Sequence, residues 1–197
     1  MDAVSVYVHI PFCRSKCGFC DCLSVPITDN ETASRFTDKL INEIELWAAL
    51  PKIERMPVSV VYLGGGTPNS LPDNCFERIV LELKKAFNIG ADTQISVECT
   101  AGFLNYDGLS FLKSLGVSRI SIGVQTLEEP LRFKLGRKLN TDAVPDRIQK
   151  SKDAGFVTCA DIIYGLPDQT IDGYIQTVEQ LIAAGIDGLS TYRFNLL

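Results

Sequence analysis

Short runs rich in valine, isoleucine and tyrosine alternate with longer segments of helical period along this chain of 197 residues. Gly, Pro or Asn residues bound these runs, as is typical of strands that end in turns. The predicted strands are residues 4–10, 58–63, 95–99, 119–124, 157–164 and 188–194. Because strands that alternate with helices are joined by βαβ crossovers, the pattern predicts an α/β fold with a parallel sheet and helices outside it.

The segments between the strands repeat apolar residues at steps of three and four, which predicts helices. The clearest example runs from Ala33 to Trp47, with Asp29 or Asn30 available as its N-cap and Pro51 as its stop. Further helices are predicted over residues 76–87, 109–115, 128–135, 143–154 and 171–181.

The length of the chain limits how many such units it can hold. A βαβ step needs about 30 residues, whereas a full eight-unit barrel takes about 250. The chain therefore has room for about six units, and its 46% of apolar residues suffices for one core. We expect a single domain over residues 1–197, in which six parallel strands form either a partial barrel or an open doubly wound sheet.

Charge and hydropathy exclude several classes of partner. The net charge is −5, and the longest basic runs are the pairs Lys84-Lys85 and Arg137-Lys138, which argues against a surface for nucleic acid or anionic lipid. The sequence has no apolar stretch of about 18 residues and no signal-peptide pattern. We therefore expect a cytoplasmic protein with no membrane span and no nucleic-acid partner.

Four of the seven cysteines lie close together, which in a reducing compartment predicts a metal or redox site rather than disulfides. Cys13, Cys17 and Cys20 place three thiolates on one loop, and thiolates bind iron–sulfur clusters and zinc. Three ligands leave one iron of a four-iron cluster open, whereas zinc would need a fourth ligand, for which Cys22 is available. Structural zinc sites usually take two separated ligand pairs, so an iron–sulfur cluster is favoured. The other cysteines are predicted to be small buried residues: Cys75, Cys99 and Cys159.

Unusual residues follow five of the predicted strands at the point where each strand ends. The cysteine cluster follows the first strand, residues 64–68 (Gly-Gly-Gly-Thr-Pro) the second, and Gln125 the fourth; Glu98 ends the third strand, and residues 165–167 follow the fifth. Taken singly, each Gly- or Pro-rich segment is explained as a tight turn. Because ligands bind at the carboxyl edge of parallel α/β sheets, the five together predict one binding site there.

The glycine run and Glu98 each have two interpretations. Residues 64–68 match neither a P-loop nor a dinucleotide-binding motif, so phosphate binding is not indicated. Consecutive glycines do allow a polar group of a ligand to approach the backbone. Glu98, at the end of a buried strand, is either partnered by ligand hydroxyls or an arginine, or is a solvated strand end.

Asp161 lies in the apolar run of residues 156–163, where a carboxylate must be paired or hydrogen-bonded. Arg119 and Arg137 are its candidate partners. His9 is the only histidine, so Ser-His-Asp or Cys-His catalysis would have to use it. We interpret His9 instead as a structural residue beside the cysteine loop.

Five segments together resemble the radical S-adenosylmethionine (SAM) enzymes and, within them, the group of oxygen-independent coproporphyrinogen dehydrogenase. They occur in the order and spacing of that family: residues 7–22, 63–68, 121–125, 135–137 and 161–170. The resemblance implies a (β/α)6 partial barrel with a [4Fe–4S] cluster on Cys13, Cys17 and Cys20. It also implies that Cys22 is not a ligand.

The resemblance further implies roles around the cluster. SAM would bind the open iron through its amino and carboxylate groups, beside Tyr7, Gly65 and Glu98. One electron would cleave SAM to methionine and a 5′-deoxyadenosyl radical, which abstracts hydrogen from the substrate. In this group a second SAM molecule would be held by the residues that match Phe19, Gly66, Thr67, Gln125, Arg137 and Asp161.

The resemblance implies a tetrapyrrole substrate and a low-potential electron donor such as a flavodoxin. Residues 102–107 and 185–197 look like the anaerobic haem-degrading methyltransferases of the anaerobilin synthase type, which is the leading expectation. Coproporphyrinogen dehydrogenase and haem chaperones are the alternatives. The dehydrogenase has an N-terminal extension and a C-terminal domain that this sequence lacks, so we expect the C-terminal portion of a longer protein to be missing.

Overall fold

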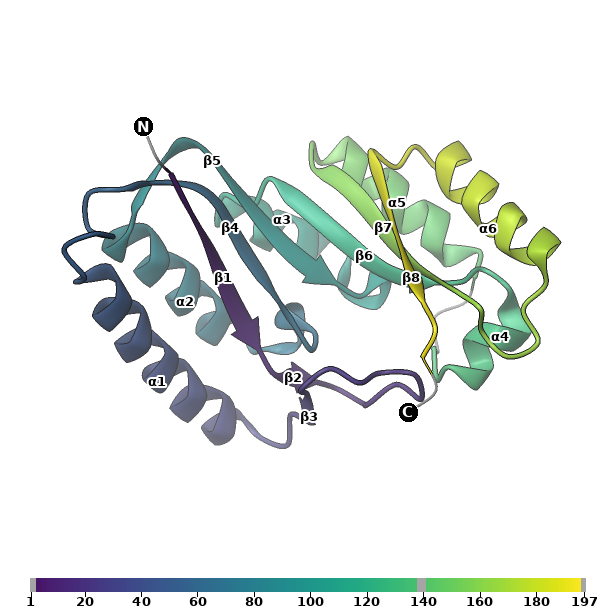
Figure 1. Ribbon diagram of the computed structural model, residues 1–197, viewed down its shortest axis with the longest axis horizontal. Helices are drawn as coiled ribbons and strands as arrows, with labels where there is room; N and C mark the ends of the chain where they lie inside the picture. Colours follow the sequence, from purple (N-terminus) through teal and green to yellow (C-terminus); the bar gives the residue numbers. More distant parts are fainter. Residues whose placement is uncertain (1–2, 138–140, 196–197) are drawn as a thin grey trace.

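The computed structural model describes residues 3–137 and 141–195, and within them six strands form one parallel sheet. Their bounds are β1 (Val4–Ile10), β4 (Pro57–Gly65), β5 (Asn88–Cys99), β6 (Arg119–Gln125), β7 (Val157–Tyr164) and β8 (Gly188–Arg193). The strands lie in the order β1-β4-β5-β6-β7-β8 (Figure 1). A doubly wound sheet reverses its strand order at a switch point, and this sheet does not. The sheet curls into a half-barrel, so the predicted partial barrel is confirmed.

Helices connect the strands and lie in an arc outside the sheet (Figure 1). Their bounds are α1 (Asn30–Ala48), α2 (Asp73–Ala86), α3 (Tyr106–Ser114), α4 (Glu129–Lys134), α5 (Ala143–Asp153) and α6 (Ile171–Ala183). Each predicted helix is present. Asp29 is the N-cap of α1, because its Oδ1 accepts a hydrogen bond of 2.6 Å from the backbone N–H of Thr32. No helix in the described ranges is both long and apolar enough to cross a bilayer.

One strand begins earlier than the sequence predicts. β5 starts at Asn88 rather than at residue 95, and most of its first half is exposed. Apolar and polar residues do not alternate in residues 88–94, so this part of the sequence does not indicate a strand. Asn88 nevertheless pairs with Pro57 of β4 before the register shifts. Pairing with a neighbouring strand overrides local preference here.

A small pairing that sequence reasoning missed holds the cysteine loop. β2 (Phe12–Cys13) pairs in parallel with β3 (Val25–Pro26). The backbone N–H of Val25 also donates a hydrogen bond of 2.7 Å to the carbonyl oxygen of Pro11. Backbone hydrogen bonds therefore hold the loop of residues 14–24 at both ends, next to the carboxyl end of β1 (Figure 1).

The core lies between the sheet and the helices. Leu63, Val97 and Ile120, on three neighbouring strands, have no exposed surface. The second half of β5 and most of β6 are buried, as expected of strands in the middle of a parallel sheet. The cysteines predicted to be small core residues are buried: Cys75, Cys99 and Cys159.

The glycine run at the end of β4 is required by the protein's own atoms. Gly65 has a φ of +117°, in the region that favours glycine. A Cβ at Gly66 would lie 2.5 Å from the carbonyl oxygen of Phe12, and a Cβ at Gly64 would lie 3.0 Å from the carboxylate of Glu98. Close packing of β4 against its neighbours thus accounts for these glycines, and approach of a ligand to the backbone stays a prediction.

We expect Gly66→Ala to lower the free energy of unfolding by about 1–3 kcal/mol, because the new methyl group overlaps backbone that the β2–β3 pair holds in place. The matched control is Gly90→Ala in β5, where no atom lies within 4 Å of the new Cβ and a change within about 1 kcal/mol is expected. Urea denaturation of both variants measures the difference. Equal effects would contradict this account of the glycine run.

Candidate active site

A cavity of about 820 Å³ opens at the carboxyl edge of the sheet, and the ends of β4, β5, β6, β7 and β8 all contribute to its lining. Tyr7 is the one predicted site residue that does not line it. The structure brings the other predicted site residues together around this space: Cys13, Cys17, Phe19, Cys20, Gly65, Gly66, Thr67, Glu98, Gln125, Arg137 and Asp161.

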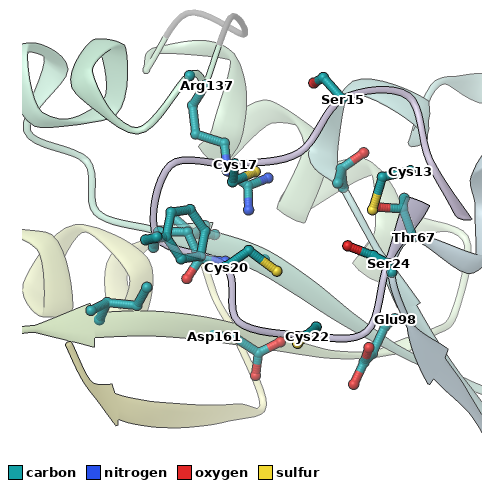
Figure 2. Close-up of a pocket in the computed structure, with 18 of the residues that line it drawn as sticks. Cys13, Ser15, Cys17, Cys20, Cys22, Ser24, Thr67, Glu98, Arg137 and Asp161 are labelled. Carbon is teal, nitrogen blue, oxygen red and sulfur yellow. The ribbon is translucent and has the colours of Figure 1, made fainter. Parts of the chain in front are cut away.

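The cysteine loop arches over the strands that carry the two carboxylates (Figure 2). Cys13 is buried at the start of the loop, with its Sγ 3.6 Å from Thr67 Oγ1. Cys17 and Cys20 are joined by a backbone hydrogen bond of 3.2 Å. Burial raises the pKa of the Cys17 thiol, and the guanidinium of Arg137, which lies beside it, opposes that shift. The neighbouring thiols of Cys20 and Cys13 raise it further, so the three sulfur atoms influence one another.

The donor set around the cavity fits an iron–sulfur cluster. Three cysteines on one loop face the same space, and thiolates are the ligands that such clusters take. Across the described residues, no three Cys, His, Asp or Glu side chains already stand close enough together to hold a metal ion. The three thiols therefore line one cavity without forming a closed metal site in the described part of the chain.

Glu98 is held by two donors at the end of β5. Tyr62 O–H donates to Oε1 at 2.9 Å, and the backbone N–H of Gly65 donates to Oε2 at 3.0 Å. Burial raises the pKa of Glu98, and these two hydrogen bonds oppose the rise. Glu98 is thus a fixed carboxylate facing the cavity rather than a solvated strand end. Tyr62 was missed by sequence reasoning, because a tyrosine within a strand is ordinary.

Tyr7 packs against Tyr62, which holds Glu98, and His9 contacts Tyr7 in turn. The ring of Tyr7 stacks on that of Tyr62 at 6.1 Å between centroids, and Tyr7 Oη lies 3.1 Å from His9 Nδ1. His9 Nε2 lies 3.0 Å from the carbonyl oxygen of Leu23, in the cysteine loop. His9 therefore joins β1 to the loop, which agrees with its interpretation as a structural residue.

Asp161 has different partners from those the sequence suggested. Ser121 O–H donates to its Oδ2 at 2.8 Å. Burial raises the pKa of Asp161, and the hydroxyl groups of Ser121 and Ser190 and the more distant charge of Arg119 oppose the rise. Neither candidate partner, Arg119 or Arg137, forms an ion pair with this carboxylate in the described part of the chain. Asp161 is hydrogen-bonded instead, by Ser121 on the neighbouring strand β6.

Gln125 is held in an unusual backbone conformation by a buried arginine. Its φ is 71°, a value that non-glycine residues seldom adopt. Arg132, which is 4% exposed, donates through Nη1 to the carbonyl oxygens of Val124 and Thr126, both at 2.9 Å. These bonds hold the backbone on both sides of Gln125, whose side chain lines the cavity. Sequence reasoning missed Arg132, because a single arginine in a short helix gives no signal of burial.

The model of the family described as "Radical SAM superfamily" matches residues 7–181, which is most of the chain. The chain belongs to the radical SAM superfamily. Radical SAM proteins use a [4Fe–4S] cluster and SAM, so the cofactors of this chain are these two, and the zinc alternative for its cysteine loop is set aside.

Curated relatives of this radical SAM chain fall into three groups. Oxygen-independent coproporphyrinogen III oxidase of Salmonella typhimurium is 31% identical over 97% of the chain and 42% of the relative. Anaerobilin synthase of Escherichia coli O157:H7 is 31% identical over 98% and 43%, and a haem chaperone of Buchnera aphidicola is 29% identical over 100% and 52%. The chain thus spans about half the length of the curated relatives it matches.

A solved structure supports the same assignment. The coproporphyrinogen III oxidase of Escherichia coli, described as a radical SAM enzyme, matches with a TM-score of 0.90 and 31% identity, over 99% of this chain and 45% of that one. The fold of this chain is therefore that of the matched part of this enzyme.

We expect Arg132→Met to lower the free energy of unfolding by about 2 kcal/mol, because it leaves a buried carbonyl without its donor. The matched control is Lys134→Met on the same helix, which removes an exposed ion pair with Asp168 and should change stability by less than about 1 kcal/mol. Denaturation of the two variants measures both. Similar effects would contradict a buried anchoring role for Arg132.

Asp161 should make stability fall with rising pH. Its folded-state pKa is raised by burial, so between the unfolded and folded pKa values the folded chain binds more protons, and the free energy of unfolding decreases as pH increases. The window begins at about pH 4, the ordinary pKa of aspartate. We expect Asp161→Asn to gain stability relative to wild type across that window, measured by denaturation of the cofactor-free chain at several pH values. A difference that stays constant or falls with pH would contradict the raised pKa.

Proposed function

We propose that this chain holds a [4Fe–4S] cluster on Cys13, Cys17 and Cys20, and uses SAM to carry out radical chemistry on a tetrapyrrole. The observation that supports this proposal is the meeting of these three thiols and two half-buried carboxylates around one cavity in a radical SAM fold. When bound, the cluster supplies the electron that cleaves SAM and so delivers a 5′-deoxyadenosyl radical.

The first SAM molecule is assigned to the side of the cavity formed by β4 and β5. Glu98 is oriented there by Tyr62 and by the N–H of Gly65, and each of its oxygens has a further lone pair for a ligand hydroxyl or ammonium. Because two donors hold the carboxylate, it need not reorganise when SAM binds. Tyr7 acts through its stacking on Tyr62 rather than by lining the cavity.

A second SAM molecule is assigned to the neighbouring part of the cavity, beside β6 and β7. Asp161 and Arg137 both line this part, carry opposite charges and are not paired with each other. The Nε of Arg137 is buried without a hydrogen-bond partner, and its guanidinium lies 5.6 Å from the ring centroid of Phe19. A zwitterionic amino-acid group would satisfy both charges at once. Gln125, at the end of β6, also lines this part, whereas Gly66 and Thr67, which the resemblance assigns to the second SAM as well, line the cavity just after β4.

The specific activity that we propose is anaerobic haem degradation with methyl transfer, as in anaerobilin synthase. The similarity of residues 102–107 and 185–197 to that group supports it, as does the anaerobilin synthase among the relatives. A low-potential donor of flavodoxin type would supply the electrons, and a cytoplasmic location stays a prediction. Oxidative decarboxylation of coproporphyrinogen and haem binding without catalysis are the other outcomes to be distinguished.

The test incubates the anaerobically reconstituted full chain with SAM, a reductant and haem, and follows the products by mass spectrometry. We expect 5′-deoxyadenosine and a methylated, iron-free linear tetrapyrrole. An unaltered haem complex would indicate a chaperone. In a parallel incubation with coproporphyrinogen in place of haem, successive loss of carboxyl groups would indicate the oxidase.

Cys17→Ala should abolish both the charge-transfer absorbance of the cluster and the formation of 5′-deoxyadenosine, because it removes one of three ligands. The matched control is Cys75→Ala, which removes a thiol that is buried in α2 and does not line the cavity, and should retain both signals. If the Cys17 variant kept full 5′-deoxyadenosine formation, or wild type formed none, the proposed radical chemistry would be wrong.

A further inference from the structure

The cationic side chains that line the cavity are all arginines. The chain carries 19 lysines and arginines and a net charge of −5. Among the described residues no lysine lines the cavity, whereas four arginines do: Arg14, Arg132, Arg137 and Arg193. Arginine presents a planar fork of donors that matches a carboxylate, whereas lysine is a flexible point charge. The lining is thus suited to planar anionic groups.

Two of these arginines already have roles. Arg132 is buried and donates to backbone carbonyls on both sides of Gln125. Arg137 lies beside Cys17 and over the ring of Phe19. Neither Arg14 nor Arg193 has a role in holding the cluster or the two SAM molecules proposed above.

Arg14 lies on the cysteine loop at one side of the cavity. Its guanidinium carbon is 4.2 Å from the ring centroid of Phe103, which also lines the cavity and belongs to the short helix η2 (Ala101–Phe103) directly after β5. Stacking on an aromatic ring holds the plane of the guanidinium and leaves its edge N–H groups free. Arg14 is exposed, and no carboxylate of the described chain lies within 4.0 Å of it.

Arg193 lines the cavity from the end of β8. It is the last residue of β8, where it stands opposite Tyr164 in the register with β7. It is exposed and, throughout the part of the chain that is described, has no ion-pair partner. Arg14 and Arg193 thus reach the cavity from two different elements, the cysteine loop and the end of β8.

We propose that Arg14 and Arg193 bind two different carboxylates of one large substrate across the mouth of this cavity. The inference rests on the proposed function, since a tetrapyrrole with acidic side chains is such a substrate. Acidic groups approach a chain of net charge −5 unfavourably, so unpaired arginines at the mouth supply the local attraction that binding needs. Two separate anchors would also fix the orientation of a flat ring.

The test measures binding of haem and of haem dimethyl ester, in which both carboxylates are masked, to the anaerobically reconstituted full chain by absorbance titration. We expect Arg14→Gln and Arg193→Gln each to weaken haem binding about tenfold, and the double variant about 100-fold, because each removes a charge-assisted contact. Binding of the ester should change less than twofold. The control is Arg35→Gln, an exposed arginine of α1 that does not line the cavity and should leave haem binding unchanged.

The outcomes separate this inference from the function on which it rests. If wild type binds haem and its ester equally, or the variants weaken both to the same extent, the carboxylate anchors are wrong while haem binding stands. If the variants lose SAM affinity instead, the arginines belong to the cofactor site and the inference is overturned. If wild type binds neither haem nor its ester, the tetrapyrrole function fails and the anchors fail with it.

Discussion

Parallel pairing of the strands in chain order is the constraint on which the rest of the structure depends. Because every strand of the sheet runs in the same direction, all carboxyl ends meet at one edge. Backbone hydrogen bonds within the sheet and close packing on the helices leave little freedom for polar side chains elsewhere. The cysteine loop after β1, the glycine turn of β4 and Glu98 at the end of β5 therefore face one cavity, although long stretches of chain separate them.

The charges around this cavity suit ligands that carry both signs. Glu98 and Asp161 are held by hydroxyl and backbone N–H donors rather than by cations. Arg14, Arg137 and Arg193 face the cavity without a carboxylate partner in the described chain. Unpaired charges of this kind contribute little to folding, so their placement is understood best as complementarity to a bound molecule. A zwitterionic cofactor and an acidic substrate would satisfy them in different parts of the same space.

Much of the fold could be predicted from the sequence, because strand and helix signals here have different periods and end at recognisable residues. The prediction failed where a segment becomes a strand only by pairing with residues far from it in the sequence. The first half of β5 and the β2–β3 pair form only because a neighbouring segment supplies backbone partners, and their own residues do not signal strands. The supporting residues Tyr62 and Arg132 were missed for a similar reason, since their importance lies in what they contact rather than in what they are.

The sequence by itself determined the class of fold, the edge at which the site lies and the residues that gather there. Those properties follow from residue type and spacing along the chain, which act locally. Only the tertiary structure decided that the strands of the sheet lie in chain order, that Asp161 bonds to Ser121 instead of an arginine, and that Arg132 holds the backbone around Gln125. Each of these depends on which side chains come within about 3 Å of one another, a distance that packing sets and spacing along the chain does not.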